Sequence, residues 1–75
     1  MNIIPEQLDA AIQVVIVLGE TIKELGRVPN GKLYAEMMPL IPIDAYNKAI
    51  RVLKTAGLVT EVNHELIWVS NPALN

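Results

Sequence analysis

The apolar residues change their spacing at Gly57, and this change constrains the fold more than any other feature of the sequence. From Ile43 to Ala56 they recur every three or four positions, as they do along one side of an α-helix. From Leu58 to Trp68 the period is two, as in a β-strand. A glycine between them can adopt the left-handed conformation that commonly ends a helix. We therefore expect a helix followed directly by a β-hairpin.

The helix predicted from about residue 43 to residue 56 has an apolar side and a polar side. The residues expected to face inward are Tyr46, Ala49, Ile50 and Leu53. The opposite side carries Asn47, Lys48, Arg51, Lys54 and Thr55. In the hairpin that follows, Asn63-His64 interrupts the alternation, which predicts a very short turn between two strands.

A first helix is predicted from Pro5 to Gly26, because proline suits the first helical turn and glycine the residue after the last. Two apolar stripes run along it at helical spacing. The stripe expected to face the core is Leu8, Ile12, Val15, Ile22 and Leu25, with Gly19 allowing close approach midway. The second stripe is Ala10, Val14, Val17 and Thr21. A helix that is apolar on two sides must bury both of them.

A second, shorter helix is predicted from Gly31 to Met38, with Asn30 as its N-cap. The residues before it, 27–29, are expected to form a short extended link. After it, the two prolines of residues 39–42 predict a tight turn that leads into the third helix.

Length and composition predict one domain spanning residues 1–75 that needs support beyond its own core. Of the 75 residues, 52% are apolar and 19% charged, and there is no cysteine to form a disulfide. Chains of this size bury only about 60% of their unfolded surface. We therefore expect a homodimer, with the second stripe of the first helix (Ala10, Val14, Val17 and Thr21) pairing with its own copy. The alternative is that this stripe packs against another part of the same chain.

Several classes of protein are disfavoured. No apolar stretch approaches the roughly 20 residues of a membrane span, and no basic residue precedes the first apolar run as in a signal peptide, so we expect a cytoplasmic protein. One histidine, His64, cannot assemble a catalytic triad or a zinc site by itself. The sequence has no glycine-rich phosphate loop. We therefore expect no enzymatic activity, no metal, no cofactor and no small-molecule ligand.

The order of elements resembles the winged helix-turn-helix superfamily, over roughly Pro5 to Ser70. The stretch from Tyr46 to Val59 ends in Ala-Gly-Leu-Val, and it is similar to the place in many winged-helix regulators where the recognition helix enters the wing. The chain also resembles short uncharacterised bacterial or phage-type winged-helix proteins. The resemblance implies a mainly α fold, with three helices and a small β-hairpin that forms a two- or three-stranded wing. It implies either DNA binding or a role as a protein-interaction module.

The charges are segregated along the chain in a way that favours the third helix as a DNA-binding element. Residues 43–57 have a local charge of +2, whereas residues 1–26 have −3. A recognition helix reads the major groove with asparagine, lysine and arginine. We expect groove contacts from Ala45, Asn47, Lys48 and Arg51, and phosphate contacts from Lys54, Thr55 and Lys32. The protein would then be a small transcription-regulator-like DNA-binding protein.

The same charges leave a rival interpretation open. The net charge is −2, and the predicted wing carries Glu61 and Glu65 but no lysine or arginine. A wing without lysine or arginine binds phosphate weakly. The alternative is a protein-interaction or assembly module that docks through the first helix, with the basic side of the third helix simply exposed to water.

Overall fold

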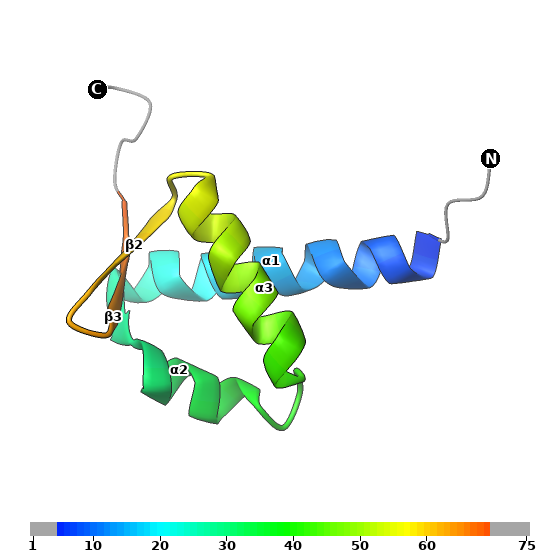
Figure 1. Cartoon of the computed structure of the whole chain (residues 1–75), viewed down its shortest axis with the longest axis horizontal. Coiled ribbons are helices and arrows are strands. Elements are labelled where there is room, and N and C mark those ends of the chain that lie inside the picture. Colours follow the sequence, from blue (N-terminus) through cyan, green and yellow to red (C-terminus); the bar gives the residue numbers. More distant parts are fainter. Residues whose placement is uncertain (1–4, 70–75) are drawn as a thin grey trace.

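The structure is a computed structural model that describes residues 5–69, with side chains from Ala11 onward (Figure 1). Its elements are α1 (Pro5–Leu25), β1 (Arg27–Pro29), α2 (Asn30–Met37), α3 (Ile43–Thr55), β2 (Val59–Val62) and β3 (Glu65–Trp68). These residues therefore form a mostly helical fold with a small antiparallel sheet, as the sequence predicts. No helix within them combines the length and the apolar composition needed to cross a bilayer.

The sheet has three strands in the order β1-β3-β2, and both pairings are antiparallel. The predicted hairpin forms β2 and β3, joined by Asn63 and His64 at positive φ angles of 52° and 65°. Two left-handed residues give the tight turn whose twist matches the flanking strands. The predicted extended link is a third strand, β1, in which Val28 lies opposite Leu66. Because β1 is an edge strand, Pro29 at its end removes no central hydrogen bond.

The third helix is confirmed in its limits and in its buried side. Tyr46, Ala49, Ile50 and Leu53 are all at most 5% exposed. Gly57 has a φ of 80°, its N–H donates to the carbonyl of Lys54, and the next N–H donates to that of Leu53. This pair of hydrogen bonds is typical of a helix that ends just before a left-handed residue. The helix axis and the start of the hairpin are thereby fixed to each other.

The core-facing stripe of α1 is only partly as predicted. Ile22 is fully buried and Val15 packs against the core, as predicted, whereas Ile12 is 46% exposed and Leu25 57%. Leu18, which was not in the predicted stripe, is also fully buried. The prediction for Ile12 and Leu25 was wrong because α3 crosses α1 near its middle, and neither end of the helix lies under that crossing (Figure 1). Leu8, which belongs to the same stripe, lies outside the residues whose side chains are described.

Gly19 lies where α1 crosses α3, as predicted. A Cβ atom at this position would lie 3.2 Å from Cδ2 of Leu53 and 3.9 Å from the ring of Trp68. The missing side chain therefore lets the two helices and the end of β3 meet closely. Leu53 is 3% exposed, so it has little room to move away.

Candidate nucleic-acid interface

Four predicted contact residues share one exposed side of α3: Asn47, Lys48, Arg51 and Thr55. They lie at steps of one, three and four residues, which places them on one helix face directed away from the core. Asp44, in the first turn, is exposed on the same side and places one acidic group there. We call Asn47, Lys48, Arg51 and Thr55 the outer face of α3.

The other two predicted contacts on this helix are placed differently. Ala45 is half-buried and packs against the core, so it lies beside the outer face and not on it. Nζ of Lys54 donates a hydrogen bond to Oε1 of Glu61 in β2 at 2.5 Å, and the two residues form an ion pair. In the structure Lys54 is therefore paired with β2, although its side chain is 40% exposed.

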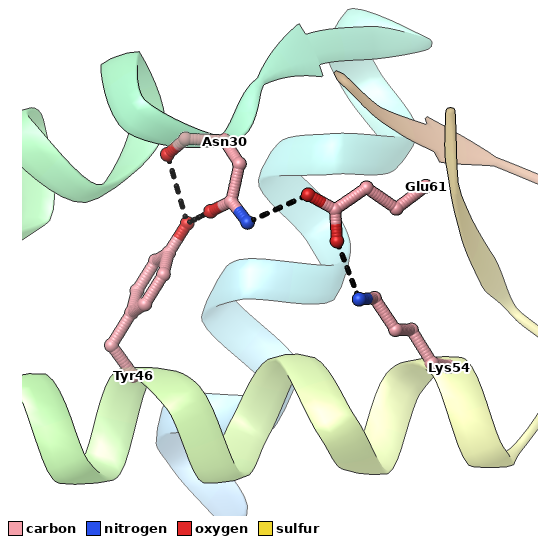
Figure 2. A network of polar contacts seen from close by, with 4 residues as sticks. All are labelled: Asn30, Tyr46, Lys54 and Glu61. Atoms are coloured by element: carbon pink, nitrogen blue, oxygen red, sulfur yellow. Dashed lines mark hydrogen bonds and ion pairs between the residues drawn. The ribbon is translucent and has the colours of Figure 1, made fainter. Parts of the chain in front are cut away.

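The ion pair belongs to a chain of four side chains that joins three elements (Figure 2). Nδ2 of Asn30, at the start of α2, donates to the second carboxylate oxygen of Glu61 at 3.1 Å. The hydroxyl of Tyr46 in α3 donates to Oδ1 of Asn30 at 2.5 Å. Tyr46 and Lys54 lie two turns apart on α3, so the network fastens the wing strand and α2 to one edge of that helix. We call these four residues the α2–wing network.

Two residues of the network have shifted pKa values. The pKa of the Tyr46 hydroxyl is raised to about 12, first because the side chain is buried and second because the Glu61 carboxylate lies nearby. Hydrogen bonds from Lys54 and Asn30 lower the pKa of Glu61 below its ordinary value. At neutral pH the network therefore contains a neutral phenol and a carboxylate.

The role of Asn30 differs from the one expected from the sequence. It was expected to cap α2, but α2 begins at Asn30 itself, Pro29 is the extended residue before it, and no side chain caps the helix. The backbone N–H of Asn30 donates instead to the carbonyl of His64 at the hairpin turn, at 2.8 Å. Both polar atoms of its side chain have hydrogen-bond partners in other elements. Sequence rules that consider only neighbouring residues do not predict such partners.

The second glutamate of the β2–β3 hairpin, Glu65, is also paired. Oε1 of Glu65 accepts from Nη2 of Arg27 in β1 at 2.6 Å and from Nε at 2.9 Å. Both glutamates of the β2–β3 hairpin therefore have a cation beside them, which partly offsets their negative charge. Lys32, the remaining predicted phosphate contact, is exposed in the first turn of α2.

A pocket of about 430 Å³ lies between α2, α3 and the hairpin turn, and sequence reasoning did not predict it. Asn30, Tyr34, Asn47, Glu61 and His64 contribute to its wall. These residues come from three segments up to 34 positions apart, and no local pattern connects them. Asn47 is the one member that also belongs to the outer face of α3.

The residues predicted for a dimer interface differ in how far they are exposed. Val17 is 49% exposed, whereas Val14 is partly buried and lines an apolar groove between α1 and α3. Thr21 is half-buried, and its hydroxyl donates to the carbonyl of Val17 at 2.8 Å. Ala10 lies outside the residues whose side chains are described.

The groove has a volume of about 720 Å³. It lies between α1, α3 and the loop that joins α2 to α3, and its wall includes Ala11, Val14, Val15, Ile41, Ala49 and Val52. The charged members of the wall are Asp44 and Lys48. We call this the α1–α3 groove.

Within the described part of the chain, no three histidine, aspartate or glutamate side chains lie close enough to hold a metal ion. Comparison with protein-family models, with curated proteins and with solved structures found no match. The candidate site therefore depends on the geometry of this chain alone.

Proposed function

We propose that the protein is a small DNA-binding protein of the winged-helix type that places the outer face of α3 in the major groove. The observation that carries the proposal is the separation of roles along α3. Its buried side packs into the core, and Lys54 at one edge forms an ion pair with β2. Four side chains remain exposed on the outer face: Asn47, Lys48, Arg51 and Thr55. A helix that packs against the core on one side and carries amide and cationic side chains on the other is suited to base recognition.

The order of elements supports the same assignment. A helix, an edge strand, two more helices and a hairpin whose last strand pairs with the first is the arrangement expected of a winged helix. In that arrangement α3 is the recognition helix and β2–β3 the wing. The paired glutamates of the wing lower its charge repulsion toward DNA, but the wing supplies no cation of its own.

The proposal predicts weak, salt-dependent binding. Lys32, Lys48 and Arg51 are the cations expected to approach phosphates or bases. About three such contacts predict a slope of roughly −3 in a plot of log affinity against log salt concentration. The test is fluorescence anisotropy with a labelled random-sequence duplex, titrated at low and at moderate salt.

A charge reversal with a matched control locates the contact. Arg51→Glu should weaken binding by about tenfold or more. Lys23→Glu makes the same change of charge on α1, where Lys23 lies over the ring of Trp68, 5.9 Å from its centroid, and it should weaken binding far less. Absence of binding at low salt, or an equal effect of the two variants, contradicts the proposal.

The α1–α3 groove favours a second candidate function, a protein-interaction module. Large exposed apolar surfaces rimmed by polar residues commonly mark protein contacts. This candidate predicts that Arg51→Glu leaves protein association unchanged and that the wild-type chain fails to bind the duplex. The anisotropy titration therefore separates the two candidates directly.

A further inference from the structure

The backbone and side-chain polar groups of Asn30 all have partners outside α2. Its N–H donates to the carbonyl of His64 at 2.8 Å, and its Nδ2 donates to Oε2 of Glu61 at 3.1 Å. The Tyr46 hydroxyl donates to its Oδ1 at 2.5 Å and lies 3.2 Å from its backbone carbonyl oxygen. This one residue therefore anchors the start of α2 to α3 and to the hairpin (Figure 2).

Asn30 is followed by Gly31, and asparagine before glycine is the pair of residues most prone to deamidation. In that reaction the backbone nitrogen of the second residue attacks the side-chain carbonyl carbon of asparagine, and glycine has no side chain to hinder the attack. Gly31 is exposed, and a Cβ atom there would have nothing within 4 Å. Because it lies in the first turn of α2, its N–H has no acceptor within the helix. The other asparagines of residues 5–69, Asn47 and Asn63, precede lysine and histidine.

We propose that Asn30 is a deamidation site that the α2–wing network protects, and that its conversion to aspartate detaches the start of α2 from the hairpin. The Gly31 nitrogen gives up its proton and forms a bond to Cγ of Asn30. The Cγ–Nδ2 bond breaks, and the amide leaves with that proton as ammonia. Water then opens the cyclic imide and yields aspartate or isoaspartate, so water is the one co-reactant.

The network protects Asn30 because the reaction requires its side chain and the adjacent backbone to move. The Gly31 nitrogen must approach Cγ directly, whereas the helical backbone and the hydrogen bonds of Asn30 keep both groups in place. The first turn of α2 must therefore open locally before the ring can close. The bonds that Asn30 makes with Tyr46 and Glu61 oppose this opening. Loss of one such bond should raise the open population, and with it the reaction rate, about fivefold.

The product cannot rejoin the network in the same way. Aspartate at position 30 has no side-chain N–H to donate, and its carboxylate would face Oε2 of Glu61, where the two side-chain atoms now lie 3.1 Å apart. Two carboxylates at such a distance repel each other. Lys54 is bonded to the other oxygen of Glu61, so it does not lie between them. Because the ammonia is lost, the change does not reverse. This inference does not depend on DNA binding.

Mass spectrometry of proteolytic fragments, taken over time from the chain held at mildly alkaline pH, tests the protection. Asn30 should convert roughly tenfold or more faster in the urea-unfolded chain than in the native one. In the native state, Tyr46→Phe should raise the rate at Asn30 about fivefold. Ile22→Val is the matched control, because it weakens the buried core without touching Asn30. Equal rates in native and unfolded chains, or in the two variants, overturn the proposal.

A double-mutant cycle tests the consequence for the fold. Asn30→Asp, which has the covalent structure of one product, should lower the urea midpoint. Adding Glu61→Gln should recover part of the loss, because glutamine can donate the hydrogen bond that position 30 no longer donates. Glu65→Gln removes the same charge from β3, where the carboxylate pairs with Arg27, and should not recover it. Additive effects of Asn30→Asp and Glu61→Gln, or equal recovery by both glutamine variants, overturn the proposed repulsion.

Discussion

Lys54 of α3 donates to Glu61 of β2 at 2.5 Å, and this ion pair joins the helix that carries the candidate interface to the wing beside it. Glu61 also accepts from Asn30, so one carboxylate links three elements. The Glu61 carboxylate is therefore one of the contacts that hold the hairpin against α3.

Acid should weaken the fold through Glu61. Because the folded-state pKa of Glu61 lies below its ordinary value of 4.5, its contribution to stability is complete above that pH and is lost as the pH falls through the folded-state pKa. Glu61→Gln should lower the free energy of unfolding at pH 7 by about 1 kcal/mol and flatten the loss of stability in acid. Urea unfolding at a series of pH values measures both effects. A variant with the same acid profile as the wild type would contradict the role of Glu61.

Alkali should weaken the fold through Tyr46. The pKa of Tyr46 is about 12 in the folded protein against an ordinary value of 10.0. Its contribution is therefore complete below pH 10 and is lost as the pH rises toward 12, because the unfolded chain ionises first. Tyr46→Phe should cost about 1 kcal/mol at pH 7 by losing the bond to Asn30, and should remove most of this alkaline loss. Tyr34→Phe is the control, because it removes the same hydroxyl group from the neighbouring ring, whose centroid lies 5.1 Å from that of Tyr46.

The crossing of α1 and α3 should tolerate no side chain at position 19. Alanine favours a helix over glycine by up to about 1 kcal/mol, but at Gly19 its Cβ would press on the buried Leu53. Gly31, in α2, has open space around it. We expect Gly31→Ala to stabilise the protein by up to about 1 kcal/mol, and Gly19→Ala to be less stable than that variant by at least about 1 kcal/mol. Thermal unfolding of both variants checks the difference, and equal melting temperatures would refute it.

The hairpin turn should gain from glycine at position 64. His64 has a φ of 65°, a conformation that costs non-glycine residues about 1 kcal/mol, and the preferred two-residue turn is Asn-Gly. His64→Gly should therefore raise the free energy of unfolding by about 0.5–1 kcal/mol. The bond from the Asn30 N–H is to the backbone of His64 and should persist. His64→Ala keeps the strained φ and should show no gain in the same denaturant titration.

If the protein binds DNA, Glu61 should limit the affinity by holding Lys54. Glu61→Gln should tighten binding to a random duplex about threefold at low salt, because it releases a cation near the outer face of α3. Glu65→Gln removes the same charge but releases Arg27 at the far strand of the sheet, and should tighten binding less. The double change Glu61→Gln with Lys54→Gln should return the affinity to near the wild-type value. Equal tightening by the two single variants would show that only net charge matters.

The features that the sequence predicted well depend on residues close together in the chain. The buried side of α3, its end at Gly57 and the two-residue turn at Asn63-His64 follow from periodicity and backbone preference, which act over a few residues. The close approach at Gly19 was also predicted, because a lone glycine inside an apolar helix commonly has a packing reason.

The features that the sequence did not predict depend on which distant residues meet. Asn30 follows the rule for an N-cap, yet its side chain bonds Tyr46 and Glu61, 16 and 31 residues away. Lys54 belongs to a basic stripe, yet β2 brings a carboxylate to it. Ile12 fits the core period of α1 but lies beyond the place where α3 crosses. Periodicity states which side of a helix is apolar, whereas only the packing of the helices decides how far along its length that side is covered and which polar groups find partners.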